Sequence, residues 1–129
     1  MSYGNKEVIG LTAAFKVGTG GVTAGAAVKL DASGDVVLGT AATEVIIGVA
    51  LTTQLISETV SVQLAGVAKM VASGTVTLGD QVEVGAAGVV LTAGGATAYS
   101  IGVALTTAAT TGRVMVLLNL PNCATPANS

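Results

Sequence analysis

An internal repeat runs through this sequence. The residues of the second half match those of the first at one fixed spacing, here called the repeat offset, which is the distance from residue 47 to residue 101. The clearest match is the heptapeptide Ile-Gly-Val-Ala-Leu-Thr-Thr, which starts at residue 47 and again at residue 101. Aligned without a gap, residues 14–64 and 68–118 are identical at 22 of 51 positions. This similarity indicates a duplication, so the fold must be one that two copies of a short unit can build together.

The apolar pattern inside each copy has the period of a β-strand. Val60-Ser61-Val62-Gln63-Leu64 alternates apolar and polar residues, which is typical of a strand with one buried face. Residues 31–35 and 85–88 are rich in turn formers and predict hairpin connections. No segment has the 3.6-residue apolar stripe of a capped helix. Strands are therefore expected at 22–30, 35–38, 45–52 and 59–64, and again at the equivalent positions of the second copy.

The sequence predicts an all-β protein, a small β-barrel or sandwich built from two pseudo-equivalent repeats. We place the repeats at 13–66 and 67–120, with an N-terminal arm at 1–12 and a flexible C-terminal tail at 121–129. Either the two halves close one barrel, or two small barrels lie side by side. The single barrel is favoured because a repeat this short buries a core poorly alone. The one cysteine, Cys123, lies in the tail and cannot form an internal disulfide.

Charge and hydropathy argue against two classes of partner. Five Lys and Arg residues face seven Asp and Glu residues, giving a net charge of −2, and no basic stripe is available for nucleic acid. No apolar run approaches the roughly 18 residues that a membrane helix needs. The apolar segment 8–15 is short and flanked by charges, unlike a secretory signal. We expect neither nucleic acid nor a membrane as a partner, and a mostly neutral surface suited to packing against neighbours.

Residues able to carry chemistry are scarce. The chain has no histidine, so the commonest general base and zinc ligand is missing. Asp31 and Asp35 could form an acid pair, but their equivalents are Gly85 and Val89, so we interpret them as turn formers. The glycine-rich stretch 18–21 lacks the lysine and the helix of a phosphate-binding loop and is expected to be a tight turn. We therefore predict no enzyme activity, no metal and no cofactor.

The pattern of apolar residues, glycines and turns in each repeat resembles that of small phage head decoration proteins, also called capsid cement proteins. Residues 47–64 and 101–118 carry the likeness, with Ile-Gly-Val-Ala-Leu, a polar turn and Val-x-Val-x-Leu. Ala65-Gly66-Val67 leading into Gly79-Asp80-Gln81-Val82 adds to it. The Gly-Asp turn is absent from the first copy, and the Cys-containing tail is an addition to the family pattern.

This resemblance implies a function without chemistry. The family members bind the outside of an icosahedral head, often as trimers, and stiffen it after expansion. The implied partners are the major capsid protein and further copies of this chain. The implied location is the outer capsid surface of the virion, after synthesis in the host cytoplasm.

The N-terminal arm is the segment that we expect to make contacts. It lies outside the repeat and combines an aromatic residue, two charges and apolar anchors, namely Tyr3, Lys6, Glu7, Val8 and Ile9. We expect it to order on a capsid subunit or a neighbouring copy by strand addition. Two other functions stay open at this point. One is a carbohydrate- or cell-surface-binding module with Tyr3 or Tyr99 as its platform, and the other is a subunit of another self-assembling shell.

Overall fold

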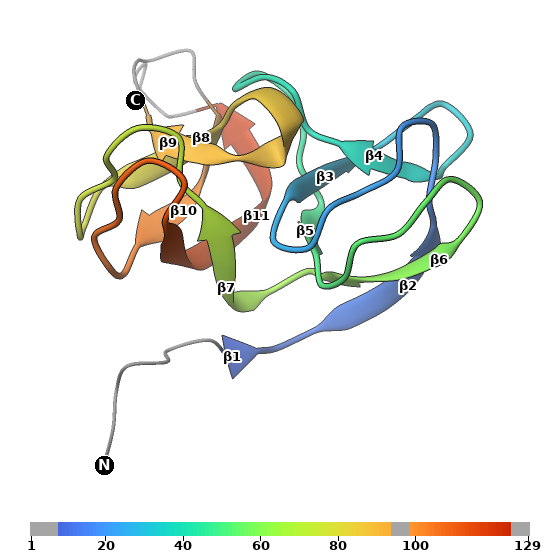
Figure 1. Cartoon of the computed structure of the whole chain (residues 1–129), viewed down its shortest axis with the longest axis horizontal. Coiled ribbons are helices and arrows are strands. Elements are labelled where there is room, and N and C mark those ends of the chain that lie inside the picture. Colours follow the sequence, from blue (N-terminus) through green and yellow to red (C-terminus); the bar gives the residue numbers. More distant parts are fainter. Residues whose placement is uncertain (1–7, 94–98, 125–129) are drawn as a thin grey trace.

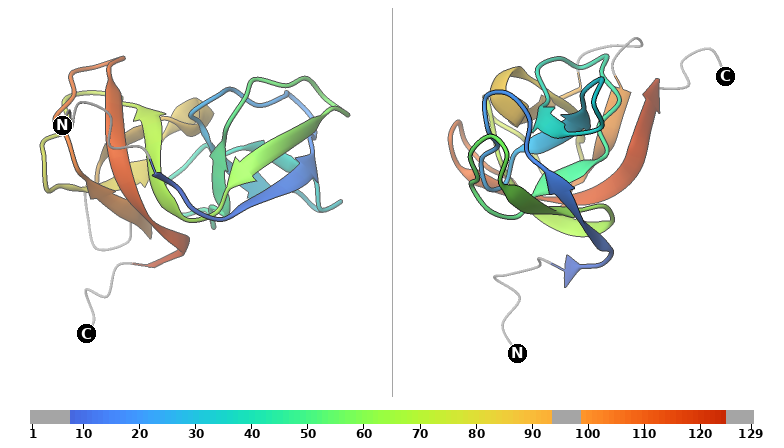
Figure 2. Two further views of the ribbon diagram at one scale, coloured as in Figure 1. Left: turned by 90° about the horizontal axis from the view of Figure 1, so that it is seen from below. Right: turned by 90° about the vertical axis from the view of Figure 1, so that its right-hand side faces the viewer.

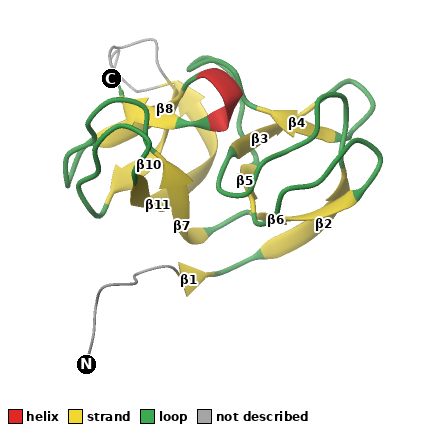
Figure 3. Cartoon of the chain, in the orientation of Figure 1, coloured by secondary structure: helices red, strands yellow, loops and turns green. Residues whose placement is uncertain are grey.

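The structure is a computed structural model that describes residues 8–93 and 99–124, with side chains described from residue 10 to residue 120 in those ranges. The described residues form eleven β-strands and one 3₁₀ turn (Figure 3). None of their helical structure is long and apolar enough to cross a membrane. In chain order the elements are β1 (Val8–Ile9), β2 (Thr12–Lys16), β3 (Ala27–Leu30), β4 (Val36–Leu38), β5 (Gly48–Ala50), β6 (Thr59–Gln63), β7 (Gly66–Val71), β8 (Gln81–Val84), η1 (Ala86–Gly88), β9 (Val90–Thr92), β10 (Tyr99–Ala104) and β11 (Arg113–Ala124).

Each repeat forms its own antiparallel sheet. The first sheet has the strand order β2-β6-β5-β3-β4, and the second has the order β1-β7-β11-β10-β8-β9. Apart from β1, the two orders are the same, and β3 and β4 have the same bounds as β8 and β9 once the repeat offset is applied. The prediction of an all-β protein with two similar halves is confirmed.

Both sheets curl, so that the chain after β2 meets β4 and the chain after β7 meets β9. Val17, just after β2, forms a parallel bridge with Val36 at the start of β4, and Ala72, just after β7, forms the equivalent bridge with Val90. Each repeat is thereby a small five-stranded barrel, and the two barrels lie side by side (Figures 1 and 2). The structure thus has the second of the two arrangements left open by the sequence, not the single barrel that the short repeat favoured.

The two barrels share part of their hydrophobic core, although each repeat alone is too short to bury a large one. The first barrel has a small core of its own, in which Val28, Val36 and Val62 are fully buried. The core of the second barrel extends across the boundary and takes in Ala27 and Ile46 from the first repeat. The halves therefore stabilise each other by burying apolar area that neither could bury alone.

The seam between the barrels is built from small residues and backbone contacts. A Cβ atom on Gly88, which has φ +76°, would lie 2.7 Å from the carbonyl oxygen of Ala27, so η1 packs directly on β3. The backbone N–H of Tyr99 donates to the carbonyl of Ala42 at 2.8 Å, which joins β10 to a loop of the first repeat. The buried side chain of Gln63 donates to the carbonyls of the connecting segment 65–67 at 3.1 and 3.2 Å.

Two positions explain why the heptapeptide is the most similar part of the repeats. Its glycines, Gly48 and Gly102, lie where the neighbouring strand approaches too closely for a Cβ atom. Its second threonines, Thr53 and Thr107, accept hydrogen bonds from the backbone N–H groups of residues 24 and 78, at 3.0 and 2.9 Å. These threonines therefore have a hydrogen-bonding role in both copies, in addition to their β propensity.

Strand boundaries differ from the sequence-based expectation in several places, and the strand expected at 45–52 is confined to β5. Residues 22–26 form a bridge and a turn before β3 begins at Ala27, because the N–H of Ala26 bonds back to Thr23 at 3.0 Å. Strands β2 and β7 were not expected. Residues 121–124, which we placed in a flexible tail, belong to β11, where Cys123 and Ala124 pair with β10. The register shifts between Ser100 and Gly102, and Pro121 lies in the bulged segment opposite, where its missing N–H is tolerated.

A carboxylate organises the loop that reaches from the first barrel to the second. Glu44 pairs with Lys29 and accepts hydrogen bonds from the N–H and hydroxyl of Thr40 at 2.6 and 2.8 Å and from the N–H of Ala41 at 3.0 Å. Burial acts to raise the pKa of Glu44, but these bonds outweigh it and lower the pKa from 4.5 to about 2. The charged form of Glu44 is therefore stabilised in the folded protein.

We expect Glu44→Gln to lower the free energy of unfolding by about 1–2 kcal/mol at pH 7, after allowance for solvent screening of a partly exposed pair. The folded-state pKa is below the unfolded one, so this contribution is complete above pH 4.5 and is lost as the pH falls towards 2. Urea unfolding of both proteins at pH 7 and pH 2.5 measures it. The difference between them should shrink at the lower pH, and an equal difference at both would contradict this role.

Candidate functional site

Acidic and glycine-rich segments singled out in the sequence serve as turns. The Asp31 carboxylate accepts hydrogen bonds from the N–H groups of Ser33 and Asp35, at 2.8 and 3.0 Å, which confirms its interpretation as a turn former. Residues 18–21 close a turn through the N–H of Gly21 and the carbonyl of Gly18 at 3.3 Å, with no helix after it. Within residues 8–93 and 99–124, no group of His, Cys, Asp and Glu could hold a metal ion.

The N-terminal arm is only partly described. Tyr3, Lys6 and Glu7 lie outside the described residues, and the backbone of Val8 and Ile9 forms β1. This strand pairs with β7 of the same chain, opposite Val67 and Gly66. Two of the five residues expected to make contacts are thus placed at a sheet edge, next to the connection between the barrels. Their role in binding stays a prediction.

An apolar hollow lies where the arm joins the first barrel. Leu11, with 62% of its surface exposed, lines it together with Ile47, Leu64 and Leu120, and its volume is about 330 Å³. The N–H of Leu64 donates to the carbonyl of Leu11 at 2.7 Å and fixes this part of the chain. The hollow belongs to the seam, because Leu64 packs on the first core and Leu120 on the second.

A second apolar feature is the turn between β5 and β6, here called the Leu-Ile tip and made of Leu55 and Ile56. These side chains are 68% and 56% exposed. The turn is held in shape by the Glu58 carboxylate, which accepts from the N–H of Leu55 at 2.7 Å, and by a left-handed Ser57 with φ 71°. In Figure 1 the loop that carries the tip lies at the right-hand end of the molecule, away from the second barrel.

The second repeat has the same turn without the apolar side chains. Thr111, the equivalent of Ser57, also has a left-handed φ of 66°. The backbone N–H of Gly112 donates to the carbonyl of Ala109, and in the first repeat the backbone N–H of Glu58 donates to the carbonyl of Leu55 in the same way. The tip positions there hold Ala109 and Thr110. The tip was not predicted from the sequence, because only the positions that match between the two repeats were compared. It is found at positions where the repeats differ.

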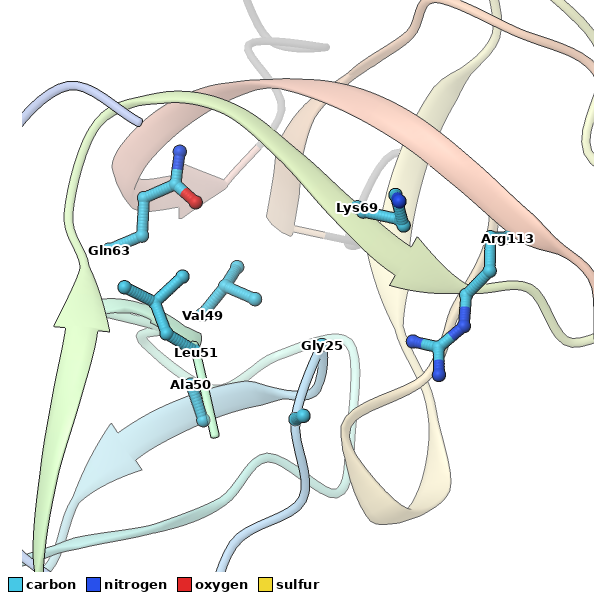
Figure 4. A pocket seen from close by; sticks show the side chains of 8 residues that line it. Gly25, Val49, Ala50, Leu51, Gln63, Lys69 and Arg113 are labelled. Carbon is cyan, nitrogen blue, oxygen red and sulfur yellow. The ribbon is translucent and has the colours of Figure 1, made fainter. Parts of the chain in front are cut away.

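A third feature is a hollow of about 360 Å³ at the seam, here called the junction hollow (Figure 4). One wall is the first barrel, including Gly25 and residues 49–51, and the other carries Lys69 of β7 and Arg113 of β11. In Figure 4 the Arg113 side chain extends from β11 towards Gly25. No spacing in the sequence indicated that these two cations would lie together.

Comparison with known proteins identifies the family. The family model described as "Phage cement protein" matches residues 36–120, which is 85 of the 129 residues. The chain belongs to the phage cement protein family. No curated protein matches the sequence. Among solved structures, the crystal structure of the head fiber gp8.5 N base of bacteriophage phi29 is similar in fold, with a TM-score of 0.70 and 14% sequence identity over 84% of this chain and 95% of that one.

Family membership confirms the resemblance found in the sequence. The phage cement family consists of structural phage proteins, so this chain is a structural protein that associates with a phage capsid. The residues matched by the family model run from the start of β4 to Leu120 and contain β7 to β10 and β11 as far as Leu120. The Leu-Ile tip, Lys69 and Arg113 all lie inside this range.

Proposed function

We propose that this cement protein binds the outer surface of a phage head, through the major capsid protein, and stabilises the expanded shell. The observation that carries the proposal is the family match over most of the chain. The described surface is consistent with that role, because it exposes large apolar side chains, among them Leu11 and the two residues of the Leu-Ile tip. A protein that stabilises a shell needs such contacts and no reaction chemistry.

Assembly on a shell also favours self-association. We propose that the chain acts as a homo-oligomer, with a trimer as the expected form, so that several weak contacts act together through high effective concentration. The mass of the purified protein by light scattering, compared with the 12.4 kDa of one chain, tests this proposal. A monomer on the head and in solution would contradict it.

Co-sedimentation with expanded, undecorated heads of the source phage tests the function. We expect saturable binding at a stoichiometry that matches the symmetry axes of the shell, and a rise in the temperature at which decorated heads rupture. Absence of binding, together with absence of the protein from purified virions, would overturn the proposal.

Deleting residues 1–10 is expected to abolish head binding while both barrels stay folded. The deletion removes the predicted contact residues Tyr3, Lys6 and Glu7 and the short β1 edge pairing, but no residue of either core. Circular dichroism and thermal unfolding check the fold, and co-sedimentation checks the binding. If the shortened protein binds heads as tightly as the full chain, the arm is not the anchor.

A further inference from the structure

The junction hollow holds two positive charges and no negative one. Of the eight described residues that line it, Lys69 and Arg113 are basic and none is acidic. In the β7–β11 pair, Lys69 lies opposite Met115 and Arg113 lies opposite Val71, so the two cations are diagonal neighbours on one face of the sheet. The backbones at such diagonal positions are typically about 7–8 Å apart, within reach of two long side chains. An anion bound in the hollow would be attracted by both cations.

The two cations are specific to the second repeat. Their equivalents in the first repeat are Phe15 and Thr59, so the pair was not inherited by both copies of the duplicated unit. The chain as a whole is acidic, with a net charge of −2. Among the described residues the one ion pair found is Lys29 with Glu44, so neither Lys69 nor Arg113 is neutralised by a carboxylate there. The hollow is thus a local positive site on an acidic protein.

Arg113 is exposed at the seam and lies beside a glycine. Its guanidinium lies over Gly25, where a Cβ atom would be 2.7 Å from Nη1 and 3.0 Å from the carbonyl oxygen of Lys69. Gly25 has φ +82°, so the turn both requires glycine and leaves the space that the guanidinium occupies. The equivalent Gly79 has nothing within 4 Å of such a Cβ atom. Because the Arg113 side chain is exposed, its planar guanidinium is accessible to a ligand that enters the hollow.

We propose that the junction hollow accepts the carboxylate of an aspartate or glutamate side chain on the shell protein to which this chain binds. Arg113 donates guanidinium N–H bonds to the carboxylate oxygens, and Lys69 supplies a second positive charge. Two cations suit a single carboxylate, whereas a nucleic-acid backbone requires an extended basic tract that this sequence lacks. The inference rests on the proposed function and names the chemistry of one of its contacts.

Head binding by charge variants tests the inference. We expect the Lys69→Gln/Arg113→Gln double variant to bind undecorated heads about tenfold or more weakly than the wild type, with a smaller dependence on salt concentration. Arg113→Lys keeps the positive charge but loses the planar guanidinium that can bind both carboxylate oxygens. Its affinity for heads should therefore lie between that of the wild type and that of the double variant. Lys16→Gln is the control, because it removes one exposed cation from β2, outside the hollow.

The outcomes separate the two proposals. Wild-type binding with an unchanged double variant would overturn the carboxylate site and leave the proposed function standing. Failure of the wild type to bind would overturn the function, and this inference with it. Thermal unfolding checks that the double variant is folded. If it is not, zero-length carbodiimide coupling of the wild-type protein on heads replaces it, and a cross-link from Lys69 to an acidic residue is expected. Decorated heads without that cross-link would overturn the site.

Discussion

Replacing Gly48 or Gly102 by alanine is expected to destabilise the protein by about 3 kcal/mol each, the upper part of the range for overpacking a well-filled core. A Cβ atom on Gly48 would lie 2.5 Å from the carbonyl oxygen of Gln63 and closer still to a methyl group of Val62. On Gly102 it would collide with the carbonyl oxygen of Leu117. A strand carbonyl cannot move aside without breaking the ladder, so the strands would have to separate. For a chain of this size, the midpoint of thermal unfolding should fall by roughly 10 °C.

Gly79→Ala provides the matched control for these two variants. Gly79 has a left-handed φ of +91° but open space around it, so alanine there costs only backbone strain of about 1 kcal/mol. Urea unfolding of the three variants separates steric collision from the loss of glycine flexibility. If Gly48→Ala is no less stable than Gly79→Ala, close strand approach does not explain why the heptapeptide keeps its glycine in both copies.

The duplication made most of the fold predictable. Alternating residues such as Val60, Val62 and Leu64 placed β6, and the repeat offset then placed β11 without further information. The turns at residues 31–35 and 85–88 were also predictable, since turn residues act locally. What a period-two pattern cannot provide is the pairing of the strands. The closure of each repeat depends on bridges such as Val17 to Val36, which join residues that no local signal connects.

Two strands were missed for an identifiable reason. In β2, Thr12–Lys16, the residues are half-buried or exposed, so no clear apolar face marks it as a strand. In β7, Ala68 and Met70 are buried, but alanine is a weak strand former and did not stand out. The tail was misjudged because Pro121 and Asn122 are typical of loops, while pairing with β10 holds Cys123 in register opposite Ser100.

The candidate contact surfaces were less predictable than the fold. The arm was proposed because it lies outside the repeat, and most of its named residues lie outside the described part of the chain. The junction hollow depends on how two barrels meet, which sequence spacing does not reveal. The Leu-Ile tip, by contrast, could have been found, because Leu55 and Ile56 are large apolar residues in a turn whose second copy holds Ala109 and Thr110.

That contrast provides the sharpest test of how the protein attaches. We expect the Leu55→Ala/Ile56→Thr double variant, which copies the tip of the second repeat, to bind heads about 30- to 1,000-fold more weakly. The estimate follows from about 2–4 kcal/mol for two large apolar side chains that would be buried on binding. Folding should be unaffected, because the second repeat adopts the same turn with those residues and both side chains are exposed in the free protein.

The converse variant, Ala109→Leu/Thr110→Ile, is the control for non-specific hydrophobic binding to the heads. It exposes the same side chains on the second barrel and should not strengthen saturable head binding. Salt concentration then distinguishes the two contacts, because an apolar tip contributes almost equally at low and high salt, whereas the junction hollow loses strength as charges are screened. If the tip variant binds as tightly as the wild type, the apolar side chains at this end of the molecule do not face the shell.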